Sequence, residues 1–312
     1  PKPFHLRTDL VMTLRYGENP QQKARWYKTD LCGLHQAAVM QGKPLSFNNL
    51  LDLQAATQTL RLLDGPSAVA VKHNNPCGAA TAPDSLDALQ TALKADPVSV
   101  FGGIVSVNFP LESKHAEVLS TLFLECVIAP EVGKEALDIL SGKKNLRVLE
   151  WPELFQFQPR LDVKTVDGGL LVQDADEVSQ DISEWEIIGQ TPDEETKRDI
   201  LLSWKICSVL KSNAISVCKD GQTLGLGMGQ VNRVDAVKQA LQRAKEFHPS
   251  KSGYILASDA FFPFPDSIEY AAKNGVSWVV QPGGSIKDKE VIAAAQRLGV
   301  TMVLTGKRHF RH

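Results

Sequence analysis

Short β-branched runs alternate with helically spaced apolar residues along this chain, and the alternation occurs twice. Runs such as Ser-Trp-Val-Val and Thr-Met-Val-Leu are bounded by Gly and Pro, which is typical of strands. Leu86, Leu89 and Leu93 recur at the spacing of one helix face. Strands that alternate with helices pack as layers around a sheet. We therefore expect an α/β layered protein of two halves with one plan, as an internal duplication would give.

The predicted elements fall into two matching sets. The first half should hold strands at 67–72, 98–107, 125–129 and 145–149, with helices at 84–95, 111–122 and 133–141. The second half should hold strands at 214–219, 253–258, 276–281 and 301–304, with helices at 234–247, 266–274 and 288–298. A proline also follows the third predicted strand of each half, Pro130 after Ile-Ala in the first half and Pro282 after Val-Gln in the second.

A domain boundary is expected near residue 190. The stretch 150–186 is predicted to be less regular, and Thr191-Pro192-Asp193 then opens a helix with Thr191 as its cap. We therefore predict one domain at 1–189, which holds Lys72 and His73. A second domain at 190–312 would begin with this short helical lead-in.

Composition excludes several classes of function. The 312 residues are 43% hydrophobic and 22% charged, as in an ordinary soluble globular protein. A net charge of −2 without any Lys/Arg block predicts no nucleic-acid partner. No apolar run approaches the ~18 residues of a membrane span, and the start lacks the apolar segment of a signal peptide. Five scattered cysteines predict reduced core thiols, so we expect a cytoplasmic protein with no membrane partner.

Lys72 and His73 are the most informative pair for chemistry. They follow the buried-strand pattern Ala-Val-Ala-Val and precede Asn-Asn-Pro, which is predicted to end the strand. The pair would then lie at a strand tip, where α/β proteins build their sites. His is the side chain that can act as a base near neutral pH. The alternative is a surface loop in which the pair has no role.

Five other segments could bind a ligand, and the first four of them have a structural alternative. Arg15-Tyr16 could capture a phosphate, although such pairs are common in loops. Asn48-Asn49 could instead cap a helix, and Gly102-Gly103 predicts either close approach of a ligand or a bulge. The segment 259–266, with three Phe and two Pro, suits a flat aromatic ligand or a hydrophobic plug. Pro282-Gly-Gly-Ser285 offers backbone amides ahead of a helix.

Taken together, these segments closely resemble the aminoimidazole carboxamide ribonucleotide (AICAR) transformylase family of purine biosynthesis. The matching segments, in order, are Arg15-Tyr16-Gly17-Glu18-Asn19, Ser46-Phe47-Asn48-Asn49, Val71-Lys72-His73-Asn74-Asn75-Pro76, Phe101-Gly102-Gly103, Lys211-Ser212-Asn213, Ser258-Asp259-Ala260-Phe261-Phe262-Pro263-Phe264 and Arg308-His309-Phe310. The resemblance implies two tandem cytidine-deaminase-like domains. Such proteins also carry an amino-terminal IMP cyclohydrolase domain, which has no counterpart here, so we expect the transformylase portion alone.

The resemblance implies transfer of a formyl group from 10-formyltetrahydrofolate, a cosubstrate, to the exocyclic amine of AICAR. His73 would be the general base, Lys72 its electrostatic and proton-transfer partner, and Asn213 would hold the reacting groups. The nucleotide pocket would comprise Arg15, Tyr16, Asn49, Lys72, Phe101, Gly102, Glu125, Arg308 and His312. The folate would contact Arg233, Ala260, Phe261, Pro263, Phe264, Asp266, Ser267 and Ser285.

The resemblance also points to a homodimer with active sites at the subunit interface. The Lys-His pair and the Phe-rich segment lie in different halves, and a twofold partner is an economical way to bring them together. No zinc is expected, because a zinc nucleobase deaminase needs His-x-Glu and Pro-Cys-x-x-Cys, whereas Cys77 is followed by Gly-Ala-Ala. A structural monovalent cation is compatible with the family. A nucleotide-binding or assembly module without catalysis is the remaining alternative.

Overall fold

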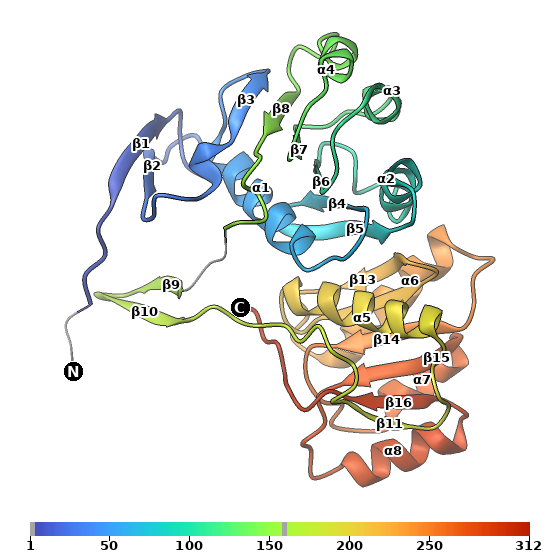
Figure 1. Cartoon of the computed structure of the whole chain (residues 1–312). Helices are drawn as coiled ribbons and strands as arrows, with labels where there is room; N and C mark the ends of the chain where they lie inside the picture. Colours follow the sequence, from blue (N-terminus) through green and yellow to red (C-terminus); the bar gives the residue numbers. More distant parts are fainter. Residues whose placement is uncertain (1–3, 158–160) are drawn as a thin grey trace.

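The computed structural model describes residues 4–157 and 161–312. This part of the chain forms a mixed α/β fold, with eight α-helices around one twelve-stranded sheet and two separate ribbons (Figure 1). The helices are α1 (Phe47–Leu60), α2 (Ser85–Lys94), α3 (Ser113–Ser120), α4 (Lys134–Leu140), α5 (Glu194–Val209), α6 (Arg233–Phe247), α7 (Asp266–Lys273) and α8 (Asp288–Arg297). A short 3-10 turn spans Leu34–Gln36.

The large sheet takes six strands from each half. The first half supplies β3 (Ala38–Gln41), β4 (Ser67–Lys72), β5 (Asn75–Thr81), β6 (Ile104–Val107), β7 (Cys126–Ala129) and β8 (Arg147–Glu150). The second supplies β11 (Glu186–Ile188), β12 (Ile215–Lys219), β13 (Gln222–Gly227), β14 (Tyr254–Ser258), β15 (Val276–Gln281) and β16 (Thr301–Leu304). The ribbons are β1 (Asp9–Leu14) with β2 (Ala24–Lys28), and β9 (Leu161–Val166) with β10 (Gly169–Asp174).

The strand order reads alike from both edges of the sheet. It is β11-β16-β15-β14-β12-β13-β5-β4-β6-β7-β8-β3, and β13 pairs with β5 at the centre in antiparallel fashion. Outward from this pair, each half adds two antiparallel neighbours, then two parallel strands, then an antiparallel edge strand. The two halves therefore share one strand topology. β11 precedes the predicted boundary at 190, yet it pairs with β16 of the second half.

The shared topology has a constant spacing in the sequence. The helix caps Ser46 and Asp193 are 147 residues apart, and each accepts the amide of the residue three positions later. Gly78 and Gly225 are also 147 residues apart, and each lets a helix pack directly on a strand. A Cβ on Gly225 would lie 2.0 Å from the carbonyl oxygen of Ala240 in α6. The second half thus repeats local packing as well as element order.

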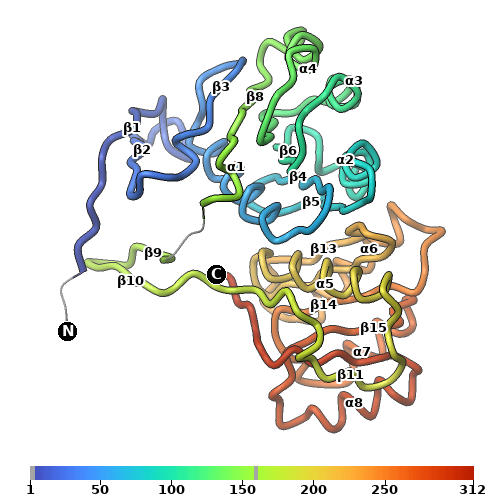
Figure 2. Tube along the Cα trace, in the orientation of Figure 1, coloured from blue at the N-terminus to red at the C-terminus, as the bar shows by residue number. Residues whose placement is uncertain are grey.

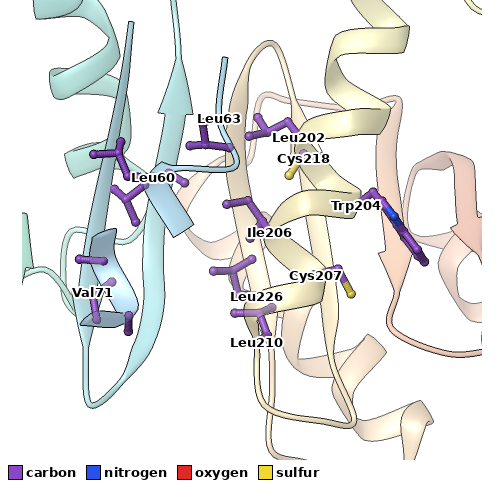
Figure 3. Packing of buried hydrophobic residues seen from close by; sticks show 14 of the residues in the cluster. Leu60, Leu63, Val71, Leu202, Trp204, Ile206, Cys207, Leu210, Cys218 and Leu226 are labelled. Carbon is purple, nitrogen blue, oxygen red and sulfur yellow. The ribbon is translucent and has the colours of Figure 1, made fainter. Parts of the chain in front are cut away.

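Three apolar cores separate the layers. One lies between the sheet and α2, α3 and α4 in the first half, and a second lies between the sheet and α6, α7 and α8. The third lies under α1 and α5 on the opposite face and continues across the join between the halves. Figure 3 shows Leu60 and Leu63 of the first half in the same cluster as Leu202 and Ile206 of the second.

Several expectations need correction. The strand predicted at 98–107 is a strand only from Ile104, because Asp96 accepts the amides of Val98 and Ser99 and holds that stretch in a turn. The helix α5 is capped by Asp193 rather than Thr191. The stretch 150–186, predicted to be irregular, contains the hairpin β9–β10, and its residues 158–160 lie outside the described structure.

Asn-Asn-Pro ends β4 as predicted, but its second Asn begins β5 at once. Pro76 is tolerated in this central strand because it lies at a register shift between β4 and β5. The five cysteines are free thiols, and Cys126, Cys207 and Cys218 are buried as expected, whereas Cys32 is exposed. In the described ranges, no helix combines the length and apolar character that a membrane crossing requires.

Candidate active site

His73 lies in a two-residue hairpin turn between two central strands. β4 ends at Lys72 and β5 begins at Asn75, so His73 and Asn74 alone form the turn. Both have positive φ, +52° and +65°, as a type I′ hairpin turn requires. Non-glycine residues in this conformation cost on the order of 1 kcal/mol or more and cluster at functional sites. The turn leaves the imidazole exposed at the strand tip.

Lys72 connects this turn to the neighbouring loop. Its Nζ donates to the carbonyl oxygen of Phe101 at 2.5 Å, and the Phe101 ring lies 5.1 Å from that of Phe123. Gly102 has a φ of +72°, and a Cβ on Gly103 would lie 2.8 Å from a carbonyl oxygen of β4. The Gly pair is therefore required by the turn and by packing. The structure brings Lys72, Phe101 and Gly102 together.

Glu125 and Asn49, both predicted for the nucleotide pocket, have partners within the protein. The amide of Glu125 donates to Gly103 at 2.9 Å, and its carboxylate pairs with Arg147 at 2.8 Å. Asn49 is buried, and it exchanges two hydrogen bonds of 3.1 Å with Ser46 in a capping box. The alternative that this segment caps a helix thus accounts for the position of Asn49 without any ligand.

Asn213 and Arg233 form one network in the second half. The guanidinium of Arg233 donates to Oδ1 of Asn213 and to Oγ of Ser258, at 2.8 Å each, and it also pairs with Asp259. Asn213 in turn donates to the carbonyl oxygen of Gln230 at 2.8 Å. Arg233 and Asp259 are buried, so the side chain predicted to contact folate is engaged inside the protein.

The Phe-rich segment divides between the two interpretations. Phe262 is buried and its amide donates to Gln281 at 2.9 Å, so this residue is a hydrophobic plug. Phe261 and Phe264 are exposed, the latter by 58%, so both rings are accessible to a ligand. Among the other predicted folate contacts, Asp266 is exposed, Pro263 and Ser285 are half-buried, and Ala260 and Ser267 are buried.

The carboxyl-terminal residues lie against both halves. Arg308 is exposed and stacks on Phe310, with its guanidinium carbon 4.9 Å from the ring centroid. The carbonyl oxygen of Arg311 accepts the Ser212 amide, its amide donates to Oγ of Ser212, and its guanidinium donates to Gln58 of α1. The carbonyl oxygen of His312 accepts a hydrogen bond of 3.0 Å from Lys211.

A cavity of about 280 Å³ opens beside the Lys72–His73 turn, at the junction of the two halves. Cys77 and Asp96 line it from the first half, and Met228 and Arg243 line it from the second. Burial raises the pKa of Cys77 to about 12, so its thiol stays protonated and is no nucleophile. Residues 4–157 and 161–312 contain no cluster of three or more His, Cys, Asp or Glu that could hold a metal ion.

Comparison with known proteins establishes the family. The family model of the AICARFT/IMPCHase bienzyme matches residues 1–243. The chain belongs to this family. It is 48% identical to the bifunctional purine biosynthesis protein PurH of Synechococcus elongatus, over 99% of the chain and 61% of that protein. It is 45% identical to the PurH of Caldicellulosiruptor saccharolyticus, over 97% of the chain and 60% of that protein. The chain thus spans about 60% of the length of these relatives.

Within this AICARFT/IMPCHase chain, the predicted site residues form separate groups. Only Lys72 and His73 of the predicted set line the cavity. Arg15 and Tyr16 lie just beyond β1, on a ribbon separate from the large sheet, with the Arg15 guanidinium over the Tyr16 ring. Sequence reasoning gave Asp259 no role, although it lies in a matching segment and holds Arg233.

Proposed function

We propose that this chain transfers a formyl group from 10-formyltetrahydrofolate to the amine of AICAR. Membership of the AICARFT/IMPCHase family restricts the chemistry to purine biosynthesis, as formyltransferase or cyclohydrolase. The observation that carries the proposal is the exposed His73 in its strained turn, with Lys72 beside it. A base and a cation at one strand tip are what acyl transfer to an amine requires.

The proposed reaction gives roles to both side chains of the pair, Lys72 and His73. The amine nitrogen of AICAR attacks the formyl carbon while His73 accepts a proton from that nitrogen. The formyl oxygen becomes an oxyanion, which the Lys72 ammonium stabilises. One Lys72 proton is engaged with Phe101, and the ammonium has two more to donate. The bond from carbon to the folate nitrogen then breaks, and that nitrogen takes up a proton from the Lys72 ammonium, which the proton held by His73 can replace.

We further propose how the substrates divide between the halves. AICAR would be bound by the first-half residues near Lys72, with Phe101 as an apolar wall, and by Arg308 at its phosphate. The folate would stack on Phe261 and Phe264, while buried Arg233 supports the site by holding Asn213. The two halves would be cytidine-deaminase-like domains in a cytoplasmic enzyme, divided near residue 190 as predicted from the sequence except that β11 belongs with the second domain.

The decisive test is the His73→Ala variant. Turnover should be abolished while AICAR affinity stays within about tenfold, because a base lowers the barrier more than it contributes to ground-state binding. Lys72→Ala should impair both binding and turnover, since its charge faces anionic groups in either state. His5→Ala, another exposed His, is the matched control. Turnover by His73→Ala within threefold of wild type would remove His73 from the mechanism.

A single-turnover assay on the wild-type protein separates the alternative function. A binding or assembly module would bind AICAR but form no formyl-AICAR when mixed with excess 10-formyltetrahydrofolate. Such a result would exclude the proposed transfer whatever the behaviour of the variants.

We propose that the active protein is a homodimer. Ribbon β9–β10 extends away from the body of the chain (Figures 1 and 2). It exposes five apolar side chains, Leu161, Val166, Leu170, Leu171 and Val172. An isolated two-stranded hairpin is marginal in water, so a covering surface would stabilise it, and a second copy is the occupant we propose.

Complementation tests the shared site. Inactive His73→Ala and Arg308→Ala proteins are mixed under subunit-exchange conditions, with sedimentation to follow dimer formation. Mixed dimers should regain one intact site of two if the residues serve one site from opposite subunits. Free exchange without recovered activity would exclude this geometry, and a monomer at assay concentration would exclude the dimer.

A further inference from the structure

Asp52 lies on helix α1, and its side chain contacts the turn formed by His73 and Asn74. It is the sixth residue of α1, and its Oδ1 accepts the backbone amide of Asn74 at 2.5 Å. Asn74 is the second residue of the turn, directly after His73. A carboxylate that accepts an amide forms one of the stronger hydrogen bonds in proteins. The position of His73 therefore depends on a side chain 21 residues earlier.

The second half repeats this contact without a histidine. Asp199 is the sixth residue of α5, 147 residues after Asp52. It accepts the amides of Asp220 and Gly221 at 2.9 and 2.7 Å. These two residues form the turn between β12 and β13, and both have positive φ. The same kind of contact thus holds both hairpin turns, and only the first turn carries a histidine.

We infer that Asp52 is a positioning residue for His73, which it holds in register through the amide of Asn74. The inference rests on the proposed formyl transfer. His73 and Asn74 both occupy a conformation that non-glycine residues rarely adopt, so the turn needs an external contact to stay in it. Burial raises the pKa of Asp52, and the hydrogen bond from Asn74 counteracts this effect. The hydrogen bond therefore acts on both partners: it holds the turn in its conformation, and it favours the charged form of the Asp52 carboxylate.

Paired substitutions in the two halves test the inference. Asp52→Ala should lower kcat by about tenfold or more, with KM for AICAR within about threefold, because a small misplacement of a base slows the chemical step. Asp52→Asn retains an acceptor oxygen and should recover most of the lost kcat. Asp199→Ala removes the matching contact in the second half, so it should lower the unfolding midpoint but leave kcat within about threefold.

Hydrogen exchange gives a readout independent of activity. The Asn74 amide should exchange about tenfold faster in Asp52→Ala than in wild type, and it should be protected again in Asp52→Asn. If wild type transfers no formyl group, the proposed function fails, and the exchange at Asn74 still decides whether Asp52 holds the turn. Unchanged exchange in Asp52→Ala would overturn the inference. Equal losses of kcat in Asp52→Ala and Asp199→Ala would also overturn it, since both would then be merely structural.

Discussion

Gly225→Ala should destabilise the protein through a clash between backbone and methyl group. Gly225 lies in β13 under α6, and an added Cβ would lie 2.0 Å from the carbonyl oxygen of Ala240 and 2.7 Å from the amide nitrogen of Ala244. Both obstacles are helix backbone, which cannot rotate away as a side chain can. The φ of Gly225 is one that alanine adopts without strain, so the clash is the main effect.

The magnitude follows from the movement that the methyl group forces. Ordinary contact begins at 3.4 Å, so α6 must move away from β13 by about 1 Å or more. A gap of this size forfeits a quarter to a half of the dispersion attraction across the interface. The buried residues Val237 and Leu241 of α6 would lose contacts together. With the usual cost of overpacking, we expect about 3 kcal/mol, or a fall of roughly 4–5 °C in Tm for a cooperative unit of this size.

Urea and thermal unfolding of three variants test the estimate. Gly78→Ala, the equivalent in the first half, should behave like Gly225→Ala, because its Cβ would lie 2.2 Å from the carbonyl oxygen of Ala92. Gly142→Ala is the control, since its nearest neighbour is a carbonyl oxygen at 3.8 Å, and it should change stability by less than about 0.5 kcal/mol. A loss below about 1 kcal/mol in Gly225→Ala would refute the packing argument.

Two further predictions concern buried charged groups, and a third concerns the removal of metal ions. Burial lowers the pKa of His115, whose Nδ1 accepts the amide of Glu112, so the unfolded chain binds the proton first as the pH falls through 6.5. The free energy of unfolding should therefore decrease as the pH is lowered from about 7.5 to about 5. In His115→Gln, urea titrations should show a weaker dependence of this free energy on pH. Lys205 is 3% exposed and pairs with Asp64, which is 85% exposed. Asp64→Ala should therefore cost about 1–3 kcal/mol in unfolding experiments and Lys205→Met less, because only the former leaves a buried charge unpaired. Formyl transfer should survive exhaustive chelation, and a loss that added zinc restores would contradict the metal-free mechanism.

The regular elements could be predicted because their apolar spacing is periodic. Strands β4 and β12 and helices α2 and α6 fall within a residue or two of the expected ranges. By contrast, β5 has almost no β-branched residues, because Gly78 and its alanine neighbours must admit a helix on one face. Strand propensity reflects such packing only indirectly, so this strand was missed.

From the residue pattern alone, without the family resemblance, the candidate site could be predicted only where its residues are consecutive. Lys72 and His73 stand out as neighbours in the sequence, whereas the contact from Lys72 to Phe101 exists only after folding. Asp52 could not be identified, because its partner is a backbone amide, and any residue other than proline supplies one. Asn213, Arg233 and Asp259 lie in three segments that only the tertiary structure joins.

The core beneath α1 and α5 makes the two halves one cooperative unit. Its residues come from both sides of residue 190, so dividing the chain there would uncover those that pack across the join. Either half alone would expose the side chains that Figure 3 shows facing its neighbour, Leu60 and Leu63 on one side and Leu202 and Ile206 on the other. A fold assembled from two similar parts has thereby lost the autonomy of those parts. Neither half can lose its packing without exposing the core of the other half.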